Sequence, residues 1–198
     1  MSHFNKFKNH LTFPFYMDEL SYQLKIPKDR IAVLIGKDGE IKKRLEEETH
    51  TQISIDSKEG EVVVTGRDAL LLYTCREIIR AIARGFNPEV AFQLLKSDYM
   101  FELVTLGDKI TKSKNAMKRV KGRLIGTKGK TRHIIEEMTG CNVCVYGKTV
   151  GIIGSYDGVA IARKAIESII LGSPHSSVYS WLERRRKEQL RDYLLGRE

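Results

Sequence analysis

The sequence predicts an α+β fold made of two copies of one unit, each with the order β-α-α-β-β-α, a three-stranded sheet and an appended helix. Two observations predict it. Segments of alternating apolar and polar residues lie between segments with helical apolar spacing, and the whole order recurs after about 90 residues. A chain of 198 residues is long enough for two domains with separate cores. Its 41% hydrophobic and 30% charged residues are typical of globular proteins.

The first unit is expected over residues 18–85, after an N-terminal extension of residues 1–17. Residues 19–26 alternate in polarity and predict a strand with one buried face. That face is expected to hold Leu20, Tyr22, Leu24 and Ile26. The remaining elements are expected as a short helix with Ile31 and Leu34, a helix over 40–48, strands over 51–56 and 61–65, and a long helix over 68–84. Gly85 ends the long helix.

A linker helix is expected over residues 86–97, because Asn87 is a good N-cap and Pro88 fits the first helical position. The second unit then follows over residues 98–172, and a C-terminal helix over 173–198. The elements expected within the second unit are strands over 99–106, 142–146 and 149–153 and helices over 115–125, 131–138 and 158–171.

Three glycine landmarks support a true internal repeat. They are the pairs Gly36/Gly126, Gly66/Gly154 and Gly85/Gly172. Several other pairs around the first landmark are identical, namely Leu34/Leu124, Ile35/Ile125, Glu46/Glu136, Glu47/Glu137 and Thr49/Thr139. Their recurrence predicts that both units share one local structure around the first landmark.

Each unit carries a two-glycine loop before a helix, Gly36-Lys37-Asp38-Gly39 in the first and Gly126-Thr127-Lys128-Gly129 in the second. Glycines three residues apart allow a tight turn and let the backbone of a ligand approach. The amides that open the following helix carry partial positive charge, which suits a phosphate group. Both loops are therefore candidate phosphate-binding loops.

The basic charge lies entirely in the second half of the chain. The net charge is +9, from 34 Lys and Arg against 25 Asp and Glu, and residues 1–99 contribute none of it. Residues 109–132 surround the second glycine loop and contain no acidic residue. The basic residues of this block are Lys109, Lys112, Lys114, Lys118, Arg119, Lys121, Arg123, Lys128, Lys130 and Arg132. A charge run is often only a solvated face, but one sign of charge around a phosphate-suited loop favours a nucleic-acid partner.

The element order with G-x-x-G between its first two helices resembles the type I (eukaryotic-type) K-homology, or KH, domain, over residues 19–85 and 98–172. That resemblance implies a loop that clamps the backbone of about four nucleotides of single-stranded RNA, with the bases in an apolar groove. Residues 148–154, 172–178 and 182–187 are similar to those of the "partner of Nob one" (Dim-two-like) family of small-subunit assembly factors. A sister family of KH assembly factors, Krr-like, shares much of this signature.

The family resemblance implies binding near the 3′ end of small-subunit ribosomal RNA, with other assembly or translation factors as partners. We expect the second unit to be the main RNA clamp, since the first loop contains Asp38 and is followed by Glu40, which repel phosphate. The residues expected to bind RNA are Gly126, Thr127, Lys128, Gly129, Lys130, Arg132, Arg123, Lys121, Arg119 and Ile125, and more weakly Gly36, Lys37 and Gly39. Val143 lines the base groove or belongs to the core, and Tyr179 and Trp181 stack on a base or, as the spacing favours, pack against the second unit.

Three patterns invite a catalytic or metal interpretation, and each favours a structural one. Cys141 and Cys144 lie in a predicted strand, where residues three apart face opposite sides, and they lack a second ligand pair for zinc. A nucleotide-binding P-loop ending at Gly129 would require glycine at position 124, which is leucine. His133 lies near Glu136 and Glu137 on a charged helix. We therefore expect no enzyme activity, metal, cofactor or small-molecule substrate.

The chain contains no apolar run near the roughly 18 residues of a membrane span, and its N-terminus does not resemble a signal peptide. The expected location is the cytoplasm. Two alternative functions stay open at this point. One is a protein-interaction scaffold that uses KH folds, and the other is an RNA-decay or regulatory adaptor.

Overall fold

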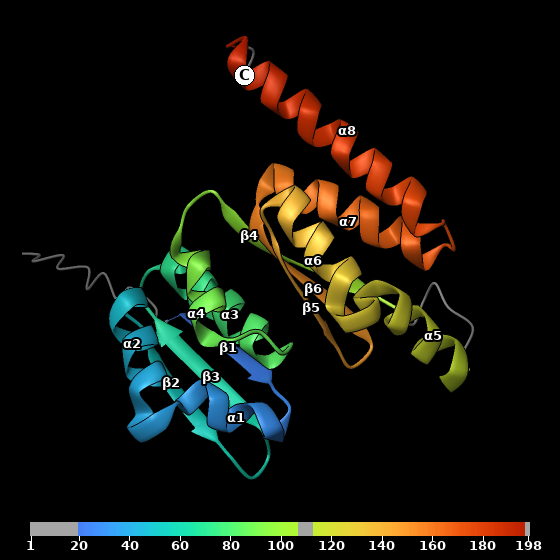
Figure 1. The fold of residues 1–198 in the computed structure, drawn as a ribbon. Coiled ribbons are helices and arrows are strands. Elements are labelled where there is room, and N and C mark those ends of the chain that lie inside the picture. The colour runs from blue at the N-terminus through green and yellow to red at the C-terminus, as the bar shows by residue number, and fades with distance from the viewer. Residues whose placement is uncertain (1–19, 107–112, 197–198) are drawn as a thin grey trace, which may run out of the picture.

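The computed structural model describes residues 20–106 and 113–196. The predicted extension over residues 1–17 and the basic residues Lys109 and Lys112 lie outside the described residues. The described chain forms two α+β units side by side, with a long helix after the second (Figure 1). The predicted fold class, two units that each carry a three-stranded antiparallel sheet and covering helices, is confirmed.

The first unit contains a three-stranded antiparallel sheet in the order β1-β3-β2. Its elements are β1 (Leu20–Lys25), α1 (Lys28–Ile35), the 3₁₀ turn η1 (Lys37–Gly39), α2 (Glu40–Thr49), β2 (Gln52–Asp56), β3 (Glu61–Gly66) and α3 (Ala69–Ala83). Asp68 caps α3 by accepting hydrogen bonds from the backbone N–H groups of Leu70 and Leu71. Two short turns follow, α4 (Pro88–Ala91) and η2 (Phe92–Leu95), and Asn87 caps α4 as expected.

The second unit repeats this arrangement with the sheet order β4-β6-β5. Its elements are β4 (Tyr99–Thr105), α5 (Lys114–Ile125), η3 (Thr127–Gly129), α6 (Lys130–Thr139), β5 (Asn142–Tyr146), β6 (Thr149–Ser155) and α7 (Tyr156–Ile170). The final helix, α8 (His175–Leu194), packs against α6 and α7 through its first half and then extends away from the unit (Figure 1).

Helices cover one face of each sheet and bury a separate core. The largest fully buried side chains of the first core are Leu34, Leu45, Leu72, Ile78, Ile79 and Ile82. Those of the second core are Leu106, Ile135, Ile152, Ile166 and Ile169. The helical and strand periodicities read from the sequence therefore place most core residues correctly.

The prediction that Leu20 and Tyr22 are buried is wrong. Leu20 is 41% exposed and Tyr22 is 36% exposed. Both lie on β1, which is an edge strand, so each has a neighbouring strand on one side only. The ring of Tyr22 is instead partly covered by the guanidinium of Arg76, 4.9 Å from the ring centroid.

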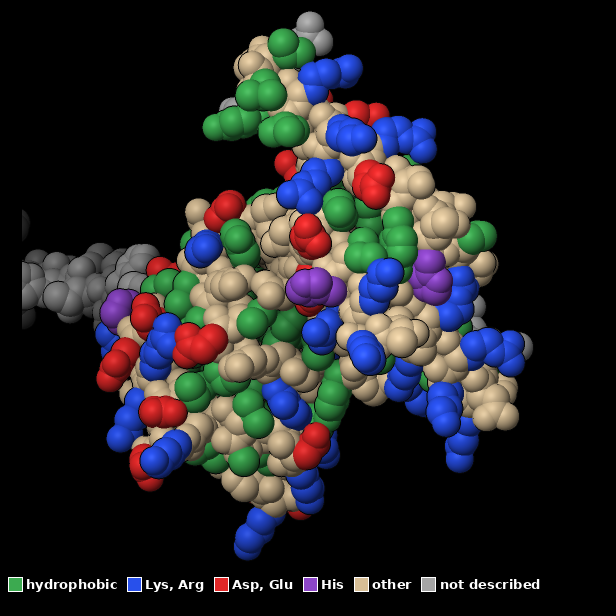
Figure 2. All heavy atoms as spheres, in the orientation of Figure 1, with side chains coloured by type: hydrophobic (Ala, Val, Ile, Leu, Met, Phe, Trp, Pro, Cys, Tyr) green, Lys and Arg blue, Asp and Glu red, His purple; other side chains and the backbone are tan. Residues whose placement is uncertain are grey.

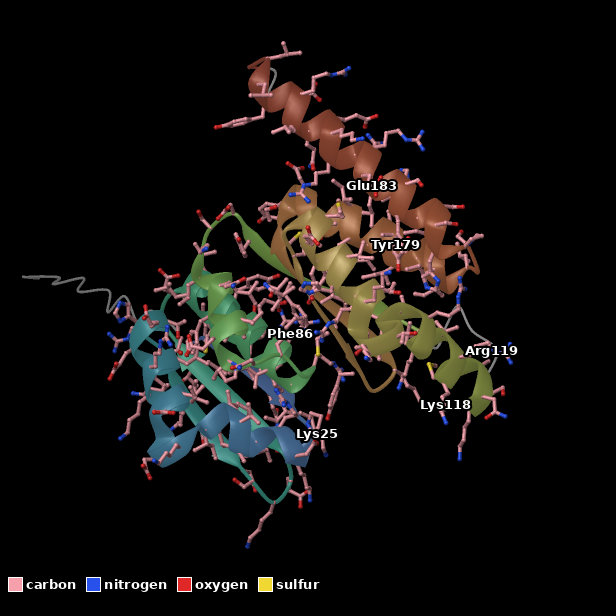
Figure 3. The ribbon with its side chains drawn as sticks, viewed as in Figure 1. Lys25, Phe86, Lys118, Arg119, Tyr179 and Glu183 are labelled. Carbon is pink, nitrogen blue, oxygen red and sulfur yellow. The ribbon has the colours of Figure 1, made fainter. Side chains whose placement is uncertain are left out.

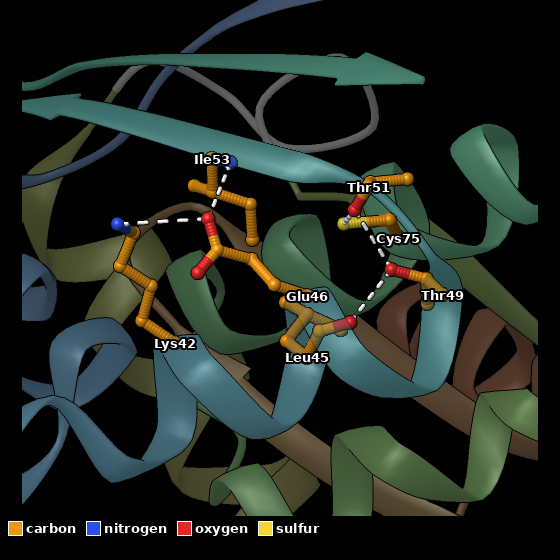
Figure 4. Close-up of polar contacts among 7 residues, drawn as sticks. All are labelled: Lys42, Leu45, Glu46, Thr49, Thr51, Ile53 and Cys75. Atoms are coloured by element: carbon orange, nitrogen blue, oxygen red, sulfur yellow. Dashed lines mark hydrogen bonds and ion pairs between the residues drawn. The ribbon is translucent and has the colours of Figure 1, made fainter. Parts of the chain in front are cut away.

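The identical pairs around the landmarks have structural roles. The carboxylate of Glu46 accepts the backbone N–H of Ile53 at 2.7 Å and lies 3.5 Å from the Lys42 ammonium (Figure 4). Glu136 accepts the N–H of Val143 at 2.9 Å in the same way. Each carboxylate thus ties a helix to an edge strand, β2 or β5.

Thr49 and Thr139 are likewise equivalent. Their hydroxyls donate to the carbonyl oxygens of Leu45 and Ile135, at 2.6 and 2.7 Å. The Thr49 hydroxyl also contacts that of Thr51 at 2.8 Å, and the Thr51 hydroxyl lies 3.3 Å from the Cys75 sulfur (Figure 4). The hydroxyls of Thr49 and Thr139 thus close the last turn of the equivalent helix in both units, which accounts for the recurrence of threonine there.

The two sheets differ on the face that the helices of their own unit leave open. In the first sheet this face presents polar, exposed residues such as Ser21, Gln23 and Ser54. In the second sheet the corresponding face carries Phe101 and Ile153, which pack into the core cluster of the first unit. The second sheet is therefore covered on both faces, once by its own helices and once by the first unit.

The contact between the units is close. Phe86, which follows α3, meets Phe101 edge to face with ring centroids 6.0 Å apart, where the two units adjoin (Figure 3). A Cβ on Gly85 would lie 2.9 Å from the Cys144 sulfur, and one on Gly151 would lie 2.5 Å from the Phe86 ring. Small residues on each side of the contact let backbone and aromatic rings approach.

Two hydrogen bonds flank this contact. The Tyr146 hydroxyl donates to Asp29 at 2.7 Å, and the Asn142 side-chain amide donates to Gln93 at 3.0 Å. The hydrogen bond to Asp29 favours the protonated phenol and so raises the pKa of Tyr146. Both donors come from β5, so this strand connects the second sheet to the first unit.

Candidate nucleic-acid interface

The two glycine loops have the same backbone conformation. Gly36 and Gly126 have φ of 75° and 74°, and Gly39 and Gly129 have φ of 80° and 79°. The third residue of each loop is also left-handed, with φ of 52° at Asp38 and 53° at Lys128. Non-glycine residues adopt this region uncommonly, so its recurrence indicates one shared loop geometry.

The two glycines of a loop serve different purposes. A Cβ on Gly126 would lie 2.4 Å from the Thr131 hydroxyl oxygen, and one on Gly36 would lie 2.4 Å from Ile41. The first glycine is therefore required for packing inside the protein. A Cβ on Gly129 would meet nothing within 4 Å, so the second glycine serves the left-handed turn and leaves the loop surface open.

The side chains on this common backbone differ in charge. In the second loop Thr127 and Lys128 are exposed, and the exposed Lys130 follows. In the first loop Asp38 occupies the backbone position of Lys128, and Glu40 occupies that of Lys130. Figure 2 shows Lys and Arg side chains gathered over α5, whereas acidic and basic side chains are interspersed over α2.

The structure places Arg123 differently from the expected open phosphate track. Its guanidinium donates to the carbonyl oxygens of Ile169 and Ser173, at 2.8 and 2.5 Å. In the first unit, Arg30 makes the equivalent pair of hydrogen bonds to Ile82 and Phe86, at 2.8 and 2.6 Å. Both arginines therefore hold the C-terminal end of the long helix and the chain that follows it.

The other expected RNA-binding side chains lie around the second loop. Arg132 is exposed and lies 3.5 Å from Glu136, an ion pair that competes with a phosphate contact. Arg119 on α5 is exposed, and Lys121 is half-buried. Ile125 is 38% exposed directly before Gly126, so its apolar side chain is open to solvent beside the loop.

The residues left with two interpretations belong to the core or pack against it. Val143 is 5% exposed and belongs to the second core. Trp181 packs against the same core, and the Lys164 ammonium lies 5.4 Å from its ring centroid. Tyr179 donates from its hydroxyl to Thr131 at 2.9 Å. His175 and Gly122 also lie beside the second loop, and no sequence pattern predicts this because neither belongs to the glycine motif.

The described residues contain no group of three or more His, Cys, Asp or Glu side chains that could hold a metal ion. Cys141 faces the second core and Cys144 the first, and burial raises the pKa of both thiols. The second loop follows helix α5, not the strand that a P-loop requires. No helix within the described ranges is long and apolar enough to cross a membrane.

The comparisons with known proteins agree with this architecture. Residues 21–81 match the model of the KH domain, and residues 100–187 match the model of the eukaryotic-type (type I) KH domain. A KH domain-containing protein of Methanocaldococcus jannaschii is 45% identical over 169 residues, which cover 83% of this chain and 74% of that protein.

Two further matches are an RNA-binding protein and a protein solved in a complex with RNA. The RNA-binding protein pno1 of Dictyostelium discoideum is 29% identical over 83% of this chain and 71% of its own. Among solved structures, aDim2p of Pyrococcus horikoshii, in a complex with a/eIF2alpha and rRNA, is 51% identical with a TM-score of 0.82. That match covers 88% of this chain and 97% of aDim2p. The chain therefore belongs to the Dim2-like ("partner of Nob one") family of tandem KH-domain proteins.

Proposed function

We propose that the chain is a single-stranded RNA-binding protein of small-subunit ribosome assembly, that it binds ribosomal RNA near the 3′ end, and that the second KH unit is its main RNA clamp. The relative from Dictyostelium discoideum is named an RNA-binding protein, and aDim2p forms a complex that contains rRNA. We take the units as residues 18–85 and 98–172. The proposed activity is binding without catalysis, and the proposed location is the cytoplasm.

One observation carries the assignment of the clamp to the second unit. The two loops share their backbone dihedral angles, yet Lys128 stands where the first loop has Asp38. Because the geometry is equal, charge decides which loop holds phosphate better. At a separation of about 4 Å two unit charges interact by about 1 kcal/mol in bulk water and by more near a protein surface, so exchanging Asp for Lys changes the preference substantially.

In the proposed complex the exposed loop residues Thr127 and Lys128 contact the RNA backbone, and Lys130 neutralises a neighbouring phosphate. Ile125, half-exposed at the end of α5, contacts a base. Gly126 and Gly129 keep the loop conformation. Arg123 supports the clamp from behind by holding the chain between α7 and α8. Arg119 and Lys121 extend the positive field along α5.

The first unit makes a weaker RNA contact or a protein contact on this proposal. Its loop keeps Gly36, Lys37 and Gly39, so a backbone contact is still possible. The complex of aDim2p also contains a/eIF2alpha, which supports assembly or translation factors as partners of this chain.

The test is a binding titration with a single-stranded RNA that ends in the small-subunit rRNA 3′ sequence, followed by fluorescence anisotropy. For a single strand, log K falls with log salt by about 0.7 per phosphate contacted. Lys128→Ala should lower that slope by about this step, and Lys37→Ala should lower it less. A scrambled RNA should bind more weakly to the wild type. Equal slope losses in the two variants contradict the assignment of the clamp.

A protein-interaction scaffold is the second candidate, and a depression between the units favours it. The depression is lined in part by Leu70, Tyr73 and Tyr156, which are 73%, 48% and 60% exposed. Contiguous exposed apolar residues commonly mark protein interfaces. The scaffold function is favoured if Lys37→Ala and Lys128→Ala both bind RNA as well as the wild type does.

A further inference from the structure

A second concave site lies beside the glycine loop of the second unit. It has a volume of about 410 Å³ and is formed by α5, the loop, the start of α6 and the first turns of α8. We call it the α5–α8 notch. The side chains and the glycine that matter in it are Arg119, Gly122, Arg123, Lys130, His175 and Tyr179. No residue of β5 lines the notch, so it is separate from the groove between the loop helices and the strand.

The notch carries one sign of charge. Arg119, Arg123 and Lys130 line it, and none of its lining residues is Asp or Glu. The guanidinium of Arg123 is fixed by its two carbonyl partners, so its charge stays beside the notch. The side chains of Arg119 and Lys130 make no hydrogen bond or ion pair with any other described residue, which leaves their side-chain donors available to an anion.

Gly122 forms an open part of the notch wall. It lies inside α5, where glycine is less favourable than alanine. A Cβ at this position would meet nothing within 4 Å, so packing within the described protein does not require glycine. The missing side chain instead leaves room for a ligand to approach the helix backbone closely.

Helix α8 forms a fixed wall of the notch. The His175 Nε2 donates to the Arg123 carbonyl oxygen at 2.9 Å, since a carbonyl can only accept. The Tyr179 hydroxyl donates to Thr131 at 2.9 Å. These bonds join α8 to both helices that flank the loop, so the wall is in place before a ligand arrives.

The first unit keeps a counterpart of Arg123 in Arg30, but it lacks the other two positive charges. Ninety positions earlier, Asp29 stands in place of Arg119 and Glu40 in place of Lys130. Asp29 is also occupied, because it accepts the hydrogen bond from Tyr146. Two of the three cationic side chains of the notch therefore occur in the second unit and have acidic residues at the equivalent positions of the first.

We propose that the α5–α8 notch binds a phosphate and its ribose from the same RNA strand, outside the roughly four nucleotides that a KH loop clamps. The volume falls in the range of small-ligand pockets, which is enough for one such group. The inference rests on the proposed RNA clamp. It adds that the C-terminal helix is part of the RNA-binding surface and that the bound strand continues past α5.

The experiment compares charge reversal at two neighbouring positions of α5, Arg119→Glu and Lys118→Glu. Lys118 and Arg119 are adjacent (Figure 3), but consecutive helix positions face different directions and only Arg119 lines the notch. The net charge changes equally in both variants. Anisotropy with a tetranucleotide and with a twelve-nucleotide RNA of the same core sequence, at fixed salt, gives Kd for each variant.

We expect the Kd of Arg119→Glu for the longer RNA to be about tenfold higher than that of Lys118→Glu. The two variants should bind the tetranucleotide with equal Kd. Gly122→Leu tests the same site without a charge change, because it fills the notch with a good helix former. It should lose affinity only for the longer RNA, and its thermal unfolding should show that the fold is retained.

Equal Kd values of Arg119→Glu and Lys118→Glu for the longer RNA would contradict the notch proposal without affecting the proposed loop clamp. The notch proposal would also be contradicted if Arg119→Glu lost the same fraction of its affinity for the tetranucleotide as for the longer RNA. If the wild type binds neither RNA, the proposed function fails, and the notch proposal fails with it.

Discussion

The two KH units share a backbone and differ in what they present. Their glycine loops agree within a few degrees in φ, and the same Glu and Thr positions join helix to strand in both. The exposed loop positions, in contrast, carry Asp38 and Glu40 in one unit and Lys128 and Lys130 in the other. Residues inside the unit thus maintain the same loop geometry in both units, while the exposed loop residues differ in the sign of their charge.

The open faces of the two sheets diverge in the same manner. At equivalent positions the first sheet has Thr65 and the second has Ile153, which is fully buried against the first unit. One sheet faces outward with polar residues, and the other is an internal layer of the molecule. The two units therefore have unequal environments, and four predictions test that inequality.

The largest effect is expected where the second sheet meets the first unit. Ile153→Thr removes buried apolar atoms and buries a hydroxyl, and should lower the free energy of unfolding by about 2–3 kcal/mol. The reverse change at the equivalent position, Thr65→Ile, lies on the open face of the first sheet and should change it by less than about 0.5 kcal/mol. Urea denaturation measures the free energy of unfolding of both variants. Equal changes would mean that the open faces of the two sheets are equally buried.

The next effect concerns a feature that the units share. Glu46→Ala and Glu136→Ala each leave an edge-strand N–H without its carboxylate and should each cost about 1–2 kcal/mol of stability. Glu47→Ala and Glu137→Ala, at the adjacent exposed positions, should change it by less than about 0.5 kcal/mol. Thermal unfolding separates these pairs. A large loss at only one of the two carboxylates argues against a common structural role.

A smaller effect should follow from giving the first loop the charge of the second. Asp38→Lys/Glu40→Lys should raise the affinity for single-stranded RNA about three- to tenfold and steepen the salt slope by up to about 1.4, from two phosphates at about 0.7 each. Glu47→Lys/Glu59→Lys makes the same change of net charge away from the loop. If both double variants gain equally, overall charge and not loop position controls binding.

The smallest effect is expected at the edge of the contact between the units. The pKa of Tyr146 is raised above its ordinary value of 10.0 by the hydrogen bond to Asp29, so the folded state favours the protonated phenol. The resulting stability is present below pH 10.0 and is lost as the pH rises through the raised pKa. Tyr146→Phe should cost less than about 0.5 kcal/mol at neutral pH. The difference from wild type should shrink at about pH 11, and a constant difference would exclude the hydrogen bond as its source.

Local patterns predicted most of the fold. β5 was expected over residues 142–146 and lies there, and the long helix α7 was expected over 158–171 and spans Tyr156–Ile170. Apolar periodicity and glycine punctuation depend on residues close in the chain, so the sequence reveals them directly. The backbone of the two glycine loops follows from the same local rules.

Long-range contacts were less accessible. Arg123 was expected on a phosphate track, yet its guanidinium donates to carbonyl oxygens 46 and 50 residues further along the chain. No local sequence pattern predicts hydrogen bonds between residues so far apart in the chain. The covered face of the second sheet did leave a signal, because β4 carries apolar residues at successive positions such as Met100 and Phe101. The exposure of Leu20 and Tyr22 required the strand order, which alternation alone does not give.

The apolar open face of the second sheet has a consequence for how the protein is made. A ribosome synthesises the first unit before the second, and domains generally fold as units during synthesis, N-terminal first. The open sheet face of the first unit is polar, so it exposes little apolar surface through which a nascent chain could aggregate. The second unit has Phe101 and Ile153 on that face and finds a finished partner already tethered beside it. The order of the two units along the chain should therefore limit the exposure of this apolar sheet face during translation, and a gene with the two units exchanged is expected to yield less soluble protein.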